Sequence, residues 1–357
     1  MQKNASDKSL ALGSVSVGPR NLITDVGGLK VGHAVDEKAR TGVSVIVPDQ
    51  PAVAACSVPG GGPGTRETDA LQPANLVERV DAISLAGGSV HGLDCASGVT
   101  AAMAAAGRGF QTGAPIPSPI VPAAILFDVA NGGDKDWGMT PPYRALGIEA
   151  YEKATDAFAL GTAGAGYGAM AGMLKGGLGS ASAHLPQGPM VGALIAANPV
   201  GSVVDDEGRF WAQPMALETD QGLEFGHPHL AMQAAQAGSA HPLHNTKLGA
   251  LAAAANTSIG VVATDADLTK AEAQRVAIMA QDGLARAIRP IHTPFDGDAI
   301  FVLATGTHEL AQNEATRPAH LAILGAMAAD CVARSVARAI WLAEDLASAQ
   351  AYRSVFF

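Results

Sequence analysis

The sequence has few charged residues, which narrows the classes of protein to consider. Charged residues make up 16% of the 357 residues, well below the usual quarter, and the formal net charge is −10. Nucleic-acid binding needs clustered Lys and Arg, so this acidic balance argues against it. A surface with few charges is often buried in part against other subunits. We therefore expect a homo-oligomer.

Cysteines and long apolar runs are scarce as well. Cys56, Cys95 and Cys331 are widely spaced and form no CxxC or zinc-binding pattern, which is typical of buried apolar residues in a reducing compartment. The N-terminal segment has no continuous apolar region, and no run approaches the roughly 18 apolar residues of a membrane span. These absences predict a soluble, cytoplasmic protein.

Histidines are present, but no metal-binding motif accompanies them. The closest pairs are His227 with His229 and His241 with His244, and neither belongs to an HExxH motif or has Cys or acidic ligands at metal spacing. Such pairs are typical of solvated loops. We expect no metal and no other cofactor.

Short apolar runs between Gly and Pro predict buried strands, and apolar residues at a spacing of four predict helices. A capping box at Thr269 opens one predicted helix that ends at Pro290, and a second runs from about Pro318 to Ala349. This mixture favours a single α/β domain of layered sheets and helices over residues 1–357. The predicted strands are Val43–Val47, Val53–Val58, Ala82–Leu85, Gly192–Ala197, Ile259–Thr264 and Ala299–Thr305.

Two further segments lack a regular pattern. The glycine-rich stretch Gly161–Gly172 matches neither a P-loop nor a dinucleotide-binding fingerprint, and it predicts closely packed backbone or a turn near a site. Residues Gln236–Ala255, with Gly, His, Pro and Asn before a run of small residues, predict an exposed, loosely structured segment.

Two short segments carry residues that could do chemistry. Thr257 follows a run of small residues and opens an apolar strand, which on local sequence alone indicates an ordinary loop-to-strand transition. Asp296 and Asp298 flank Gly297 on a turn before the next strand. Two such carboxylates could bind a cation, orient catalytic groups or simply form the turn, and their spacing leaves these alternatives open.

Taken together, these segments resemble the P1 peptidase family, which includes L-aminopeptidase/D-amidase/esterases, β-peptidyl aminopeptidases and nylon-oligomer hydrolases. The resemblance spans nearly the whole chain and implies a four-layer αββα sandwich, similar in layout to N-terminal-nucleophile hydrolases, that assembles as a tetramer or larger oligomer. The longest matching block is NTSIGVVATDADLTKAEAQRVAIMAQDGLARAIRPIHTPFDGDAIF. Six shorter blocks precede it in the family's order: ITDVGGLKVGHA, GGGPGTRETDAL, LAGGSVHGLDCASGV, PIVPAAILFD, KGGLGSAS and NPVGSVVD.

The resemblance also implies self-cleavage. It places the cut between Asn256 and Thr257, giving fragments 1–256 and 257–357, and makes Thr257 the new N-terminus and the nucleophile. The freed α-amine, whose unperturbed pKa is about 7.7–8.0, could accept the hydroxyl proton near neutral pH. One residue would then supply both nucleophile and base.

Four further residues take roles by the same resemblance. Asn198 would stabilise the oxyanion, and Asp296 and Asp298 would hydrogen-bond the nucleophile and its amine. The combination of Thr, Asp and Asp is similar to the nylon-hydrolase branch. Lys175 matches that branch's active-site lysine, although it could instead be a surface lysine before a glycine turn. Phe127 stands where several members have a tyrosine that assists the oxyanion.

The resemblance thus implies a self-processing N-terminal threonine hydrolase that cleaves amide bonds of short peptides, amino-acid amides or esters, or ω-amino-acid oligomers. One alternative is an aminopeptidase strict for a free amino terminus. Another is a non-catalytic oligomeric relative that binds a small ligand and never cuts itself.

Overall fold

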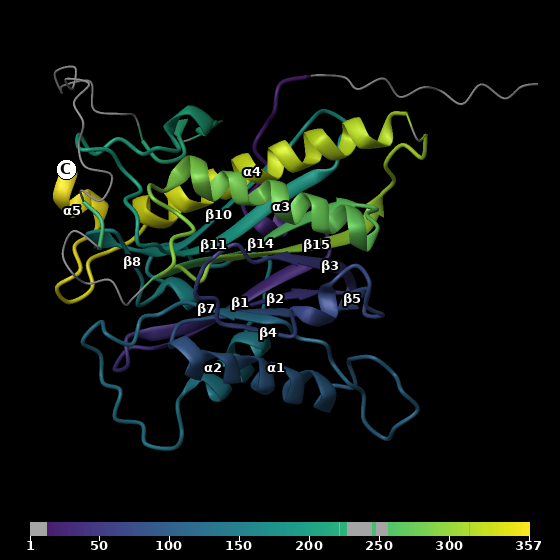
Figure 1. Cartoon of the computed structure of the whole chain (residues 1–357), viewed down its shortest axis with the longest axis horizontal. Coiled ribbons are helices and arrows are strands. Elements are labelled where there is room, and N and C mark those ends of the chain that lie inside the picture. The colour runs from purple at the N-terminus through teal and green to yellow at the C-terminus, as the bar shows by residue number, and fades with distance from the viewer. Residues whose placement is uncertain (1–12, 221, 227–244, 248–255, 314) are drawn as a thin grey trace, which may run out of the picture.

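The computed structural model describes residues 13–220, 222–226, 245–247, 256–313 and 315–357. Two β-sheets lie face to face, and helices cover the outer face of each sheet (Figure 1). The layers are therefore helix, sheet, sheet and helix. The αββα sandwich is confirmed.

The first sheet has the strand order β1-β2-β6-β7-β4 and is covered by α1 and α2. Neighbouring strands are antiparallel except for β6 and β7, which are parallel. The bounds are β1 (Leu29–Asp36), β2 (Thr41–Pro48), β4 (Thr65–Arg66), β6 (Ile83–Ala86), β7 (Ala123–Ile125), α1 (Asp94–Ala105) and α2 (Tyr143–Glu152).

The second sheet has the order β10-β11-β14-β15-β3-β5 and is covered by α3 and α4. Outside the layers lie the short helix α5 (Tyr352–Phe356), the two-stranded ribbon of β8 (Met170–Ala171) and β9 (Leu174–Lys175), and the ribbon of β12 (Glu218–Thr219) and β13 (Gly222–Leu223). The bounds of the second sheet and its two helices are β3 (Ala52–Ser57), β5 (Arg79–Val80), β10 (Gly177–His184), β11 (Met190–Asn198), β14 (Thr257–Ala266), β15 (Ala299–His308), α3 (Lys270–Ala287) and α4 (Arg317–Trp341).

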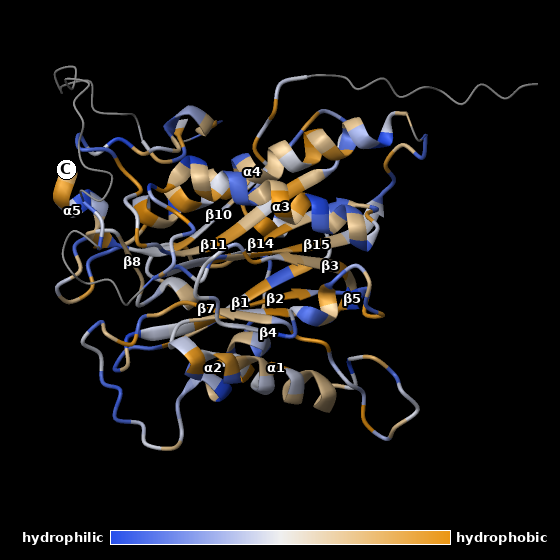
Figure 2. Cartoon of the chain, viewed as in Figure 1, coloured by the Kyte–Doolittle hydropathy of each residue, from blue (hydrophilic) through white to orange (hydrophobic). Residues whose placement is uncertain are grey.

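The central strands are buried on both faces, which explains their continuous apolar sequence. Along β14 and β15, Val261 and Phe301 pack between the two sheets, whereas Val262 and Val302 pack against α3 and α4. Figure 2 shows these strands mostly in the apolar colours and the surface loops mostly in the polar ones. All six strands predicted from apolar runs are present.

The register of the second sheet brings three strand ends to one edge. β14 pairs with β11 in antiparallel fashion, with Asn198 opposite Thr257. It pairs with β15 in parallel fashion, with Ile259 opposite Ala299. The end of β11, the start of β14 and the turn before β15 therefore meet, although they are far apart in the sequence.

The helices confirm part of the prediction. α3 begins with the capping box, in which Thr269 accepts from the Glu272 N–H and donates its own N–H back to the Glu272 carboxylate. α4 ends at Trp341, eight residues before the predicted end. α4 is long and apolar enough to cross a membrane, but 61% of its apolar window is buried and it packs on β10 and β11 as a core helix.

Candidate active site

Thr257 opens β14 with a backbone conformation that threonine rarely adopts. Its φ is +130°, whereas the other described non-glycine residues with positive φ lie between +50° and +60°. That region is open almost only to glycine, and holding another residue there costs on the order of 1–3 kcal/mol. The side chain is also buried. Backbone strain is therefore concentrated at the residue that follows the expected cleavage bond.

Backbone groups hold both sides of that bond. The carbonyl oxygen of Asn256 accepts a hydrogen bond from the Phe127 N–H at 3.4 Å. The hydroxyl of Thr257 accepts one from the Gly297 N–H at 2.8 Å. The carbonyl that a Thr257 nucleophile would attack thus already has a donor on its oxygen, and the hydroxyl is fixed in place.

Asn198, directly opposite Thr257, is held at both ends of its side-chain amide. Its Nδ2 donates to the Phe127 carbonyl at 3.0 Å. Its Oδ1 accepts from the Met170 N–H at 2.9 Å and from Lys247 Nζ at 3.1 Å. The amide group therefore reaches the same residue, Phe127, whose N–H binds the Asn256 carbonyl.

The two predicted carboxylates are fully buried on either side of Gly297. Asp298 accepts from the Ser258 N–H at 2.7 Å and from the His292 N–H at 3.1 Å, and it lies 2.9 Å from His292 Nδ1. It thereby fixes the residue next to Thr257. The carboxylate joins β14 to the turn before β15. A residue that only formed the turn would not need a hydrogen bond to β14.

Asp296 holds the other side of the same turn. It accepts from the Val200 N–H at 3.1 Å, and from the Thr293 N–H at 3.0 Å and hydroxyl at 2.6 Å. Burial and then the nearby charge of Asp298 raise the pKa of the Asp296 carboxyl. Keeping both of these close, buried carboxylates ionised at the sheet edge therefore costs free energy.

The glycine-rich segment Gly60–Gly62 packs over the turn that carries Asp296 and Asp298. The Gly60 N–H donates to the Asp298 carbonyl at 3.4 Å, and the Gly62 N–H donates to the Asp296 carbonyl at 2.8 Å. A Cβ atom on Gly60 would lie only 2.2 Å from the Asp298 nitrogen. A Cβ atom on Gly61 would lie 2.6 Å from Pro294 Cα, so both positions need glycine because the two backbones touch.

Lys175, on β9, donates its side-chain hydrogen bonds to backbone carbonyls rather than to the other four predicted residues. It is fully buried, so the alternative of a surface lysine before a glycine turn is wrong. Its Nζ donates to the carbonyls of Gly166 and Gly176 at 3.2 and 2.8 Å, and burial lowers its pKa to about 7. Lys175 pairs across the β8–β9 ribbon with Met170, whose N–H binds Asn198, and this is its link to the site.

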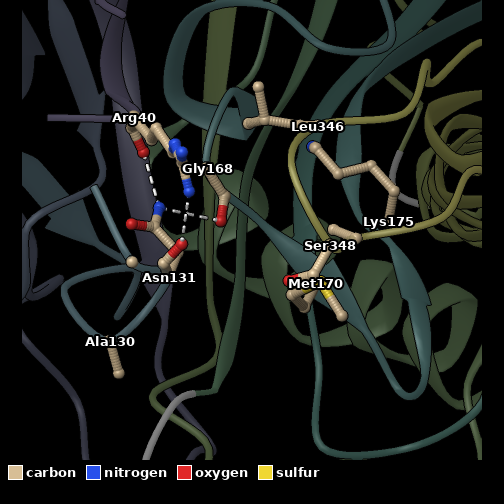
Figure 3. Close-up of a pocket in the computed structure, with 10 residues that line it drawn as sticks. Arg40, Ala130, Asn131, Gly168, Met170, Lys175, Leu346 and Ser348 are labelled. Carbon is tan, nitrogen blue, oxygen red and sulfur yellow. Dashed lines mark hydrogen bonds between the residues drawn. The ribbon is translucent and has the colours of Figure 1, made fainter. Parts of the chain in front are cut away.

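A cavity of about 370 Å³ adjoins Lys175 and Met170. Arg40 and Asn131 lie on one wall and Lys175 on the opposite wall (Figure 3). Within the described part of the chain, the charged side chains that line it are Arg40 and Lys175, both basic. The glycine-rich stretch supplies Gly168 to this cavity, where Asn131 Nδ2 contacts its carbonyl at 3.4 Å.

Lys247 is a site residue that the sequence pattern does not reveal. It lies in the segment predicted to be exposed and loosely structured, and that prediction is wrong at this point because Lys247 and Thr246 are buried. Burial lowers the pKa of Lys247 to about 7, with Asp296 acting in the opposite direction. The histidine pairs within 227–244, and the rest of that segment at 248–255, lie outside the described residues.

Comparison with known proteins identifies the family. The model of peptidase family S58 matches residues 21–353. An uncharacterized aminopeptidase of Mycobacterium tuberculosis is 43% identical over 352 residues, covering 94% of this chain and 98% of that protein. A 6-aminohexanoate-oligomer endohydrolase of a Kocuria species is 28% identical over 326 residues, covering 88% of this chain and 84% of that protein.

A solved structure agrees with the fold. The L-aminopeptidase D-Ala-esterase/amidase of Ochrobactrum anthropi, described as a variant of the Ntn-hydrolase fold, superposes with a TM-score of 0.63 at 20% identity. The superposition covers 94% of this chain and 89% of that one. This likeness concerns the fold alone. With the family match over nearly the whole chain, it leads to one conclusion: the chain belongs to peptidase family S58 and is an amide hydrolase.

Proposed function

We propose that the chain is a self-processing N-terminal threonine hydrolase that cleaves amide bonds of small substrates. The observation that carries this proposal is Thr257, buried and held at φ +130° directly after a carbonyl that the Phe127 N–H binds. Strain at a buried hydroxyl residue raises the energy of the intact chain and lowers the cost of cutting it. A non-catalytic relative would have no use for this strain.

The proposed cut is an N→O acyl shift followed by hydrolysis. Thr257 Oγ attacks the Asn256 carbonyl carbon, the C–N bond breaks, and the hydroxyl proton passes to the departing nitrogen. Water then hydrolyses the ester, which leaves a carboxylate on Asn256 and a free amine and hydroxyl on Thr257. The Phe127 N–H, already on the Asn256 oxygen, is placed to stabilise the charge that develops there.

Substrate hydrolysis would reuse the same groups. The freed Thr257 amine takes the proton from the hydroxyl as it attacks the substrate carbonyl, and water hydrolyses the acyl-enzyme. Asn198 supports the oxyanion, while Asp296 and Asp298 fix the turn that holds the nucleophile. Lys175, on the cavity wall, is proposed to act on the substrate side.

The two fragments, 1–256 and 257–357, are proposed to stay together as one catalytic domain. The second fragment supplies β14 and β15 to the middle of the second sheet, where β14 pairs with β11 and β15 pairs with β3 of the first fragment. Separating them would break two strand ladders and expose the core beneath α3 and α4.

We propose that this cavity, which Met170 joins to Asn198, receives one end of the substrate, and its charges then favour one substrate class over the strict aminopeptidase alternative. A free amino terminus would need an acidic partner, whereas the charged side chains on this cavity's lining, Arg40 and Lys175, suit a carboxylate. Peptides or ω-amino-acid oligomers with a free carboxyl end meet that requirement. N-acetylation of such a substrate is expected to be tolerated, and complete loss of turnover on acetylation would favour the alternative.

We further propose that processed units form a homotetramer in the cytoplasm and use no cofactor. The low surface charge supports assembly, as do large apolar side chains on one loop, Phe110 and Ile116, which are 61% and 68% exposed. Light scattering on the processed protein measures the assembly directly.

The experiment that tests the function compares processed wild-type protein with the Thr257→Ala variant on a chromogenic amino-acid anilide and a short ω-amino-acid oligomer. Wild type is expected to release product, and Thr257→Ala is expected to be folded, uncut and inactive. Turnover by folded Thr257→Ala would show that another residue is the nucleophile.

A further inference from the structure

Lys247 occupies a position that no part of the proposed mechanism uses. Its Nζ lies 3.1 Å from the backbone oxygen of Asn198 and 3.1 Å from the side-chain Oδ1 of the same residue. Its own N–H donates to the Val200 carbonyl at 3.1 Å. The lysine is therefore anchored along the end of β11, directly beside the residue that faces Thr257.

The contacts of Lys247 add to those that fix which way the Asn198 amide points. A side-chain amide has an acceptor end and a donor end of nearly the same shape, and only its partners distinguish the two orientations. With Lys247 Nζ and the Met170 N–H both on Oδ1, a rotated amide would place its NH2 group against two donors. The orientation with Nδ2 toward Phe127 is thereby enforced.

Burying a lysine to supply one hydrogen-bond donor costs free energy, which argues that Lys247 has a specific role. Lysine is almost never fully buried without a partner, because removing its charge from water is costly. The Met170 N–H alone would satisfy one lone pair of Oδ1. Lys247 adds the second donor and bridges the backbone and side-chain oxygens of Asn198.

We propose that Lys247 is a positioning residue, which holds the Asn198 amide with its NH2 group toward the oxyanion site. This inference rests on the proposed function, in which Asn198 supports the oxyanion. It adds a residue from the segment just before the cleavage bond, so that the first fragment carries the device that orients its own oxyanion donor.

The test is a double-mutant cycle with Lys247→Met and Asn198→Ala, measured as kcat and KM on processed protein. Asn198→Ala is expected to lower kcat about 10²- to 10³-fold. Lys247→Met is expected to lower kcat at least about tenfold with little change in KM, because a misdirected amide loses part of that stabilisation. In the Asn198→Ala background, Lys247→Met is expected to cost nothing further.

Lys270 provides a matched control. It is also largely buried, and its Nζ donates to the carbonyls of Ala70 and Asn75, away from this site. Lys270→Met is expected to leave kcat unchanged. Lys247→Gln, which keeps a neutral donor, is taken through the same cycle, so that the result does not depend on the folding of one variant.

Additive losses in the cycle would overturn the proposal, because they would mean that Lys247 acts independently of Asn198, for instance as a counter-ion of Asp296. Wild-type kcat in folded Lys247→Met, or in Asn198→Ala, would overturn it as well. Failure of the proposed function has a different signature, which is turnover by Thr257→Ala.

Discussion

The Asp298→Asn enzyme is expected to fold and to lose most of its turnover. The Asp298 carboxylate accepts from Ser258 and His292 through separate oxygens, at 2.7 and 3.1 Å. Asparagine keeps one acceptor, so its NH2 group must face one of these N–H donors. A hydrogen bond to a charged group contributes about 1.5–3 kcal/mol, and its loss at Ser258 in the transition state corresponds to about 10- to 100-fold in kcat.

The assay is the initial rate of hydrolysis of the short ω-amino-acid oligomer per processed active unit, with the cut fraction measured on the same sample. Asp330→Asn is the control, because the half-exposed Asp330 carboxylate pairs with Arg286 at 2.6 Å, away from the candidate site. Its rate is expected to equal that of wild type. Near wild-type turnover of fully processed Asp298→Asn would refute the reasoning and leave Asp298 as a turn former.

Three further predictions concern the uncut chain and are measured by urea unfolding. If Thr257 is strained, Thr257→Gly is expected to be more stable than Thr257→Ala by about 1 kcal/mol or more, and equal midpoints would contradict this. The pKa of Lys175, lowered to about 7 by burial, makes the folded state bind fewer protons than the unfolded state between about pH 7 and 10.5. The free energy of unfolding of the Thr257→Ala protein is therefore expected to rise with pH relative to that of Thr257→Ala/Lys175→Met, by at most about 1.4 kcal/mol per pH unit. Equal pH dependence of the two free energies of unfolding would contradict this. Arg334→Met is expected to cost about 3–5 kcal/mol, because it strands Glu224, whose buried carboxylate lies 2.5 Å from the Arg334 guanidinium, whereas Arg286→Met is expected to cost less than about 1 kcal/mol.

The strands that the sequence predicts are those whose apolar runs are buried on both faces. β10 escapes prediction because its residues, GLGSASAH, are small and have little preference for strands. Their size is dictated by α4, since a Cβ on Gly179 would lie 1.9 Å from the Ser335 carbonyl oxygen. This requirement depends on Ser335, which follows Gly179 by 335 − 179 = 156 residues, so no local pattern reveals it.

At the candidate site, too, some residues can be predicted from local sequence and others only from the fold. Thr257 and the two aspartates stand at strand starts, where local sequence draws attention to them, and the strand register brings them together. Lys247 is a single lysine in an otherwise featureless segment, and only the fold shows that it is buried against Asn198. The family resemblance supplied the roles, while the strain at Thr257 is visible only in the backbone.

The N-terminal sequence of the smaller polypeptide tests the central claim most directly. Active protein is separated by denaturing electrophoresis, and the smaller band is sequenced from its amino end. We predict two bands, residues 1–256 and 257–357, with the smaller one beginning Thr-Ser-Ile-Gly, and a single uncut band for Thr257→Ala. Active protein that runs as one intact chain, or a new terminus other than Thr257, would contradict the account.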